Sequence, residues 1–169
     1  MIICYYGNGK GKTTAALGLA LRASGYRKKI LFAQFIKGEW KTGEDKALGK
    51  LKNITHKKFG LGFVGIKNDQ KPLAEHKAAA ASGLEYVKQN MNKYNIVVLD
   101  EIFGAIKGKL VAADDIVALI KNKPEKVVLV LTGLPKISKI LKYCDIATEM
   151  KNIKHPYQKG QLAQKGIDF

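Results

Sequence analysis

A glycine-rich segment, GNGKGKTT at residues 7–14, directly follows the mostly apolar run IICYY and precedes a stretch with the Ala/Leu spacing of a helix. Glycines let backbone N–H groups turn toward an anion, and the start of a helix adds the positive end of its dipole. A phosphate-binding loop usually has four residues between its first glycine and the Gly-Lys-Ser/Thr triplet. Only three residues separate Gly7 from Gly11 here. The segment therefore predicts a phosphate-binding loop that is one residue short.

Two parts of the sequence supply the chemistry that such a loop requires. Lys12 would neutralise phosphate charge, and Thr13 would offer its hydroxyl to Mg²⁺. The run IVVLD ends in Asp100, which Glu101 follows, and an apolar strand that ends in an acid completes the magnesium site of such proteins. The structural alternatives are a glycine turn that caps a helix and a pair of acids that caps a strand end. The flanking strand and helix favour the binding of a nucleoside triphosphate with Mg²⁺.

Apolar runs of strand length alternate with helical patterns along the chain, and two of these runs, IVVLD and VVLVLT, are apolar on both faces. This alternation is typical of a parallel sheet that is covered by helices. We therefore expect an α/β fold of the RecA-like P-loop nucleotide-binding type, with helices on both faces of the sheet and a single domain over residues 1–169. A long loop over 57–71 and a polar tail over 154–169 that wraps the surface complete the prediction. The expected strands cover 2–6, 30–36, 54–59, 96–100, 127–132 and 146–150, and the expected helices cover 12–24, 72–91, 113–121 and 135–143.

Composition and charge narrow the setting. No apolar run approaches the roughly 20 residues that span a bilayer, and the first strand is expected to begin at Ile2, which leaves no room for a signal peptide. We therefore expect a cytoplasmic protein with no membrane partner, in which Cys4 and Cys144 are buried free thiols. The net charge of +16 comes from lysines that are spread along the chain rather than gathered in a basic helix or tail. Nucleic acid is accordingly not expected as the main partner.

Further motifs follow the short loop in a fixed order. They read FAQFIKG at 32–38, GFV at 62–64, VVLDEI at 97–102, LTG at 131–133, DIATEM at 145–150 and HPYQKGQLAQKGIDF at 155–169. Together with GNGKGKTT, they resemble the phosphate-loop family of corrinoid adenosyltransferases, which act on cob(I)alamin or cob(I)yrinic acid a,c-diamide. The resemblance covers essentially the whole chain, and the short loop and the AQKGID ending are its most specific parts.

The resemblance implies an enzyme that transfers the 5′-deoxyadenosyl group of ATP to Co(I) of a corrinoid and releases triphosphate. It also implies a homodimer, Mg²⁺ or Mn²⁺ as the metal ion, and a flavodoxin-type protein as a candidate reductant. The residues that the resemblance places on Mg²⁺ are Thr13 and Glu101, with Asp100 in support, and Lys12 and Glu101 are the expected catalytic residues. Phe63 would line the corrinoid pocket. The expected nucleotide contacts are Gly7, Asn8, Gly9, Lys10, Gly11, Lys12, Thr13 and Thr14.

The sequence departs from the family pattern at two positions. The family's GFTW reads GFVG, so that Gly65 stands at the tryptophan position, and the arginine of LTGR is Leu134. We expect transfer to reduced Co(I) to survive, because it relies on the phosphate loop. We expect the reduction of Co(II) to be the weakened step, unless Trp40 or Tyr157 fills the space that the missing tryptophan leaves. His155 is expected to stabilise a turn of the tail.

Two alternatives to the transferase stay open at this point. One is a divergent relative that binds ATP and a corrinoid without efficient transfer. The other is a different P-loop kinase or ATPase, although the two cysteines cannot supply the zinc segment typical of thymidine kinases. An arginine finger is also hard to place, because the chain has only Arg22 and Arg27.

Overall fold

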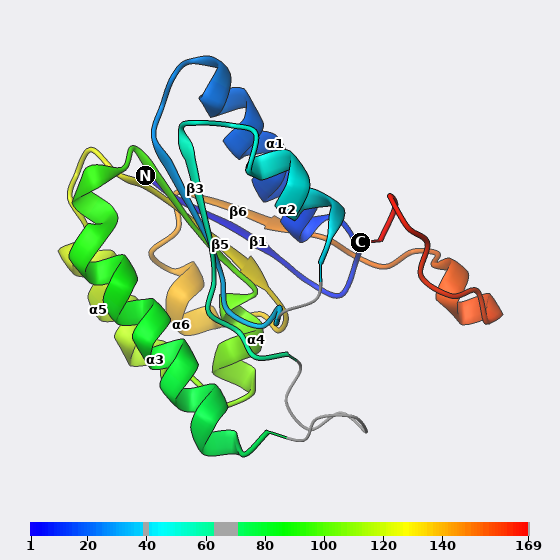
Figure 1. Cartoon of the computed structure of the whole chain (residues 1–169). Helices are drawn as coiled ribbons and strands as arrows, with labels where there is room; N and C mark the ends of the chain where they lie inside the picture. The colour runs from blue at the N-terminus through cyan, green and yellow to red at the C-terminus, as the bar shows by residue number, and fades with distance from the viewer. Residues whose placement is uncertain (39–40, 63–70, 169) are drawn as a thin grey trace.

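The computed structural model describes residues 1–38, 41–62 and 71–168 (Figure 1). Within these residues, six strands form one sheet in the order β3-β2-β4-β5-β1-β6, and every neighbouring pair is parallel. The predicted parallel α/β sheet is therefore confirmed. The strands are β1 (Ile2–Tyr6), β2 (Ile30–Gln34), β3 (Ile54–Lys58), β4 (Ile96–Asp100), β5 (Val128–Gly133) and β6 (Ile146–Glu149).

Helices cover both faces of the sheet, as expected (Figure 1). Alternate residues of each strand point to opposite faces, so the sheet separates two apolar cores. In the first core, Ala16 and Ala20 of α1 pack with Phe32 and Val98, and the larger second core lies under α3, α4, α5 and α6. The helices are α1 (Lys12–Gly25), α2 (Gly43–Leu48), α3 (Leu73–Asn90), α4 (Ile102–Lys107), α5 (Ala113–Asn122) and α6 (Ser138–Leu141), with 3₁₀ turns at Met91–Lys93 and Pro156–Lys159.

Two short helices, α2 and α4, were not predicted from the sequence. A capping box begins α2, because the side chain of Asp45 accepts from the backbone N–H of Thr42 at 2.8 Å. The helix α4 begins directly after the acidic pair, where Glu101 adopts a left-handed φ of 59°. Both helices have six residues, which is too short for the apolar periodicity that identifies a helix in a sequence.

Cys4 and Cys144 form a disulfide that joins β1 to the turn before β6. The prediction of two free thiols is therefore wrong. The sequence could not show the pairing, because the two cysteines are 140 residues apart and only the parallel pairing of β1 with β6 brings them together.

The tail after β6 runs past the phosphate loop, forms the 3₁₀ turn at Pro156–Lys159 and returns toward the first residues of α1 (Figure 1). His155 caps this turn, since its Nδ1 accepts from the backbone N–H of Tyr157 at 3.2 Å, which confirms the predicted role. None of the helices in the described ranges is both long and apolar enough to cross a membrane.

Candidate nucleotide-binding site

The loop between β1 and α1 is shaped by its glycines and by the chain that follows β6. Gly7 and Gly11 have φ values of 114° and 111°, which favour glycine. A Cβ atom on Gly7 would lie 2.3 Å from the carbonyl oxygen of Met150, and the same oxygen accepts from the N–H of Gly9 at 2.7 Å. Asn8 adds a second tie, because its Oδ1 accepts from the backbone N–H of Asn152 at 3.1 Å. The loop is therefore held closely against the chain after β6.

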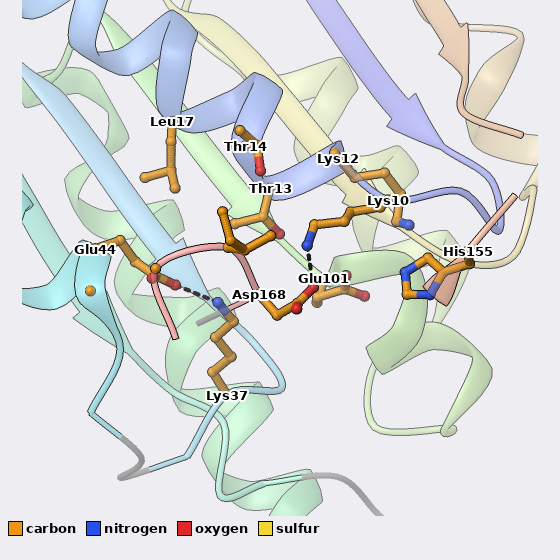
Figure 2. A pocket seen from close by; sticks show the side chains of 14 residues that line it. Lys10, Lys12, Thr13, Thr14, Leu17, Lys37, Glu44, Glu101, His155 and Asp168 are labelled. Atoms are coloured by element: carbon orange, nitrogen blue, oxygen red, sulfur yellow. Dashed lines mark hydrogen bonds and ion pairs between the residues drawn. The ribbon is translucent and has the colours of Figure 1, made fainter. Parts of the chain in front are cut away.

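The two loop lysines reach the same pocket from different directions (Figure 2). The Nζ of Lys12 donates to the carbonyl oxygen of Gly9 at 2.9 Å, which closes the loop over itself. Lys10 is paired with Asp168, near the C-terminus. The hydrogen bond from the backbone N–H of Gln164 and the contact with Lys10 hold the pKa of Asp168 below its usual range. The ionised carboxylate of Asp168 in the tail is thus paired with one of the two lysines of the loop.

Asp100 is fully buried behind the first turn of α1. Its Oδ1 accepts from the hydroxyl of Thr13 at 2.9 Å and from the hydroxyl of Thr132 at 2.7 Å, and Gln34 donates to its Oδ2 at 3.0 Å. The strand β5 lies between β1 and β4, so Thr132 on β5 stands between the strand of the loop and the strand of the acid. Because Thr13 donates its proton to Asp100, the lone pairs of its hydroxyl oxygen are left for a cation.

Glu101 lines the pocket itself. Its backbone N–H donates to the hydroxyl of Thr132 at 2.9 Å, which fixes the residue next to Asp100. Burial and the negative charge of Asp100 raise the pKa of Glu101, and the charges of Lys12 and Lys37 only partly oppose this. A buried carboxylate without enough positive charge near it is suited to receive a cation.

The opposite wall of the pocket carries a second ion pair, Lys37 with Glu44, next to Leu17 (Figure 2). Burial would raise the pKa of Glu44, but the hydrogen bond and the charge of Lys37 lower it overall. The pocket has a volume of about 440 Å³. It is lined by the loop and α1 on one side, by α2 on the other, and by the tail at Gly166, Ile167 and Asp168.

The oxygen atoms at the pocket fit a hard cation such as Mg²⁺, which prefers carboxylate, hydroxyl, water and phosphate oxygens. Thr13 and Glu101 lie on the pocket wall, and Asp100 orients Thr13 from behind. Over the described ranges, no three His, Cys, Asp or Glu side chains gather in a way that could hold a metal ion. A cation here would therefore take most of its ligands from phosphate and water.

Most of the predicted nucleotide contacts lie at this pocket, namely Lys10, Gly11, Lys12, Thr13 and Thr14, together with Glu101. Gly7 and Asn8 instead face a neighbouring cavity of about 450 Å³, which Leu134, Lys136 and Lys151 also line. Phe63, Gly65 and Trp40 lie outside the described residues.

Sequence reasoning missed several residues of the site. Thr132, Gln34 and Lys37 stand inside the motifs LTG and FAQFIKG, which identified the family but assigned these side chains no role. Asp168 likewise lies inside the AQKGID ending, and only its contact with Lys10 shows that the tail reaches the loop. Glu44 had no signal in the sequence.

A glycine loop between a parallel strand and a helix, with lysines and an acidic pair at the carboxyl edge of the sheet, is typical of the P-loop class of α/β proteins. The site thereby narrows the class of protein, and similarity to known proteins gives the family.

The family model described as ATP:corrinoid adenosyltransferase BtuR/CobO/CobP matches residues 1–169. A corrinoid adenosyltransferase of Escherichia coli (strain K12) is 32% identical over 171 residues, which cover 100% of this chain and 85% of the relative. One of Pseudomonas aeruginosa is also 32% identical, over 100% of this chain and 83% of the relative. The corrinoid adenosyltransferase CobA of Salmonella typhimurium is 31% identical, with 100% and 85% covered. The chain belongs to the ATP:corrinoid adenosyltransferase family.

Proposed function

We propose that this protein transfers the 5′-deoxyadenosyl group of ATP to Co(I) of a corrinoid and releases triphosphate. One observation carries the proposal beyond family membership. Lys10, Lys12, Thr13 and Glu101 meet at one pocket at the carboxyl end of the sheet, where a triphosphate and its metal ion would find cations, backbone N–H groups and oxygen ligands.

The reaction explains why charged groups at the pocket matter more than a general base. Co(I) brings the electron pair that forms the cobalt–carbon bond to the 5′ carbon, and the carbon–oxygen bond breaks with its pair leaving on the triphosphate. The protein therefore has no hydroxyl or water to activate. Its task is to align ATP and to stabilise the charge that develops on the leaving group.

Each residue at the loop receives a role in this proposal. The backbone from Gly7 to Thr14 would bind the phosphates, and Lys10 and Lys12 would neutralise them. Thr13 and Glu101 would hold Mg²⁺ or Mn²⁺, with Asp100 orienting Thr13. The metal ion, when bound, would add positive charge beside the triphosphate.

The corrinoid side of the site rests on the resemblance alone. Phe63 would line the corrinoid pocket. At the position of the family's arginine, Leu134 lines a cavity together with Lys136 and Lys151, so two lysines stand near the place where that positive charge is missing. The homodimer, the flavodoxin-type reductant and the cytoplasmic location stay predictions.

An anaerobic assay tests the function directly. The protein is mixed with chemically reduced cobalamin and Mg-ATP, and the products are separated to look for adenosylcobalamin and triphosphate in equal amounts. ADP in place of triphosphate would indicate a different ATPase or kinase, and binding of both substrates without product would indicate the divergent binding relative. A parallel assay that starts from Co(II) measures whether reduction is the weaker step.

A further inference from the structure

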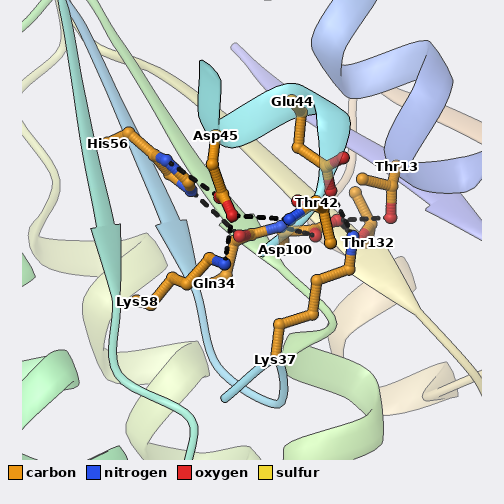
Figure 3. Close-up of polar contacts among 10 residues, drawn as sticks. All are labelled: Thr13, Gln34, Lys37, Thr42, Glu44, Asp45, His56, Lys58, Asp100 and Thr132. Atoms are coloured by element: carbon orange, nitrogen blue, oxygen red, sulfur yellow. Dashed lines mark hydrogen bonds and ion pairs between the residues drawn. The ribbon is translucent and has the colours of Figure 1, made fainter. Parts of the chain in front are cut away.

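A line of polar side chains leads from Asp100 away from the pocket and across the sheet (Figure 3). The side-chain Nε2 of Gln34 donates to Oδ2 of Asp100 at 3.0 Å, and Oε1 of Gln34 lies 2.9 Å from Nε2 of His56. These residues belong to the neighbouring strands β4, β2 and β3. Gln34 and Asp100 are both fully buried. Burying polar groups at such a depth costs free energy unless each has a hydrogen-bond partner. Each group in this line is hydrogen-bonded to the next.

The chemistry of the three groups fixes which atom donates and which accepts at each hydrogen bond of the line. An ionised carboxylate only accepts hydrogen bonds, so Gln34 must turn its NH₂ group toward Asp100. The amide oxygen of Gln34 then faces His56 and can only accept. Nε2 of His56 must therefore carry a proton. Burial lowers the pKa of His56, against the raising effect of Asp45, which favours a neutral ring. The acceptor oxygen of Gln34 at 2.9 Å then selects the ring form that carries its proton on Nε2.

The other side of His56 contacts α2. Its Nδ1 lies 3.6 Å from Oδ1 of Asp45. The second oxygen of Asp45 accepts from the N–H of Thr42 at 2.8 Å and from Nζ of Lys58 at 2.7 Å. Asp45 thus begins the helix that carries Glu44 on the far wall of the pocket. The line joins the acid behind the phosphate loop to the element that forms the opposite wall.

We propose that Gln34 and His56 are positioning residues of the nucleotide site. His56 holds the amide of Gln34 with its NH₂ toward Asp100, and Asp100 in turn holds the hydroxyl of Thr13 for the metal ion. The inference rests on the proposed function, because it takes a metal ion at Thr13 as the end of the line. Without the His56 donor, the buried amide oxygen of Gln34 has no partner, so the amide is held at one end only and its hydrogen bond to Asp100 is less well fixed.

The expected size of the effect follows from how metal sites respond to changes behind their ligands. Removal of a group that orients a ligand typically lowers metal affinity about 10- to 100-fold. We expect His56→Phe, which keeps an aromatic ring and loses the N–H, to weaken Mn²⁺ binding in the presence of ATP by about tenfold or more. His56→Gln keeps an N–H donor and should recover most of the affinity. ATP affinity without a metal ion should be unchanged in both variants.

The measurement is electron paramagnetic resonance of Mn²⁺ titrated into the full-length protein with ATP. Thr55→Ala is the matched control, because Thr55 neighbours His56 on β3 and its side chain points to the opposite face of the sheet. Equal Mn²⁺ affinity of His56→Phe and the wild type would overturn the inference while the nucleotide site stands. No ATP-dependent Mn²⁺ site in the wild-type protein would instead overturn the proposed function on which the inference rests.

A second measurement needs no variant at position 56 to fold. The chain has three histidines, so ¹⁵N spectra of the wild-type protein, assigned with His76 and His155 variants, can resolve the ring of His56. A neutral ring protonated at Nε2 near neutral pH supports the inference. A neutral ring with its proton on Nδ1 alone would overturn it, because Nε2 could then not donate to the amide oxygen of Gln34.

Discussion

Lys12 and Glu101 both line the candidate nucleotide pocket, but the residues around them affect their charges differently. Lys12 already donates a hydrogen bond to the carbonyl oxygen of Gly9, and its stem lies at the start of α1. Glu101 lies beside the buried Asp100, and its pKa is raised by burial and by that second negative charge. The charge of Lys12 therefore already has a hydrogen-bond partner in the folded protein, whereas a bound cation would stabilise the negative charge of Glu101.

Replacing Lys12 with alanine tests the phosphate loop. We expect adenosyl transfer to fall by about 10²- to 10³-fold, the usual effect of losing one electrostatic group at a developing charge. The fold should persist, because the side chain of Lys12 lies in the pocket and not in either core. Turnover is measured anaerobically, with Arg22→Ala at the exposed far end of α1 as the control. Unchanged turnover in Lys12→Ala would remove the phosphate-loop assignment.

Glu101→Gln is expected to lower the apparent affinity for Mg²⁺ and to stabilise the fold at neutral pH. The pKa of Glu101 is higher in the folded protein than in the unfolded chain, so the free energy of unfolding falls as pH rises from the unfolded pKa to the folded one. The loss is about 1.4 kcal/mol for each pH unit between these two pKa values. Glutamine does not ionise, so the variant does not lose this free energy of unfolding. The thermal midpoint of the variant should exceed that of the wild type at neutral pH, and the difference should vanish near about pH 4, the ordinary range of glutamate.

Calorimetry across this pH range measures the stability difference, and Mg²⁺ titration of the transfer reaction measures the metal. If the apparent Mg²⁺ affinity of Glu101→Gln equals that of the wild type, the metal ion takes its charge elsewhere, with Asp100 as the next candidate.

At the scale of elements, the tail braces the phosphate loop. Met150 accepts from Gly9 directly after β6, Asn152 donates to Asn8, and Asp168 pairs with Lys10. The loop is thus supported by residues that follow it by more than 140 positions. The edge of the sheet and the tail together therefore fix the shape of the loop. The tail also places the negative charge of Asp168 where, in the proposed function, a phosphate would bind.

Asp168→Asn should therefore tighten nucleotide binding. The carboxylate of Asp168 competes with phosphate for Lys10 and repels it, and both side chains are partly exposed. An exposed ion pair is a weak competitor, so we expect ATP affinity to rise by no more than about fivefold. Isothermal titration at low salt measures the change, and Asp114→Asn, which removes a surface ion pair with Lys139, is the control. A weaker affinity for ATP would show instead that the tail helps to hold the nucleotide.

At the scale of the whole molecule, the parallel sheet and its two cores set the site, and the disulfide adds a covalent tie. Cys4 lies in β1, fully buried directly before the phosphate loop, and Cys144 lies before the edge strand β6. The tie therefore holds together the same two strands whose ends shape the loop.

Reduction of this disulfide should lower the free energy of unfolding by about 2–4 kcal/mol, since the bond restricts the unfolded chain. Urea unfolding with and without dithiothreitol measures the difference, and Cys144→Ala should not respond to the reductant. Nucleotide binding should persist after reduction, because the hydrogen bonds from Gly9 and Asn152 do not pass through the sulfur atoms. Equal stability in both conditions would show that the two thiols are not joined in solution.

Local signals predicted most of the secondary structure. All six predicted strands are present, and β1 and β4 have the predicted limits. In α3, Ala80, Leu84 and Val87 are buried, whereas Leu73 at its start is exposed. The errors are the unpredicted α2 and α4 and shifts of one to three residues at element ends, where periodicity is weakest.

By itself, the sequence determined what depends on neighbours along the chain: the buried strands, the glycine loop on the first helix, and the lysines and acids of the site. The tertiary structure alone decided which distant residues meet. It placed Asp168 on Lys10, Thr132 and Gln34 on Asp100, and joined the two cysteines. The reason is physical. Apolar periodicity and turn chemistry act over a few residues, whereas these contacts arise from the order of the strands in the sheet, which no single segment of the sequence encodes.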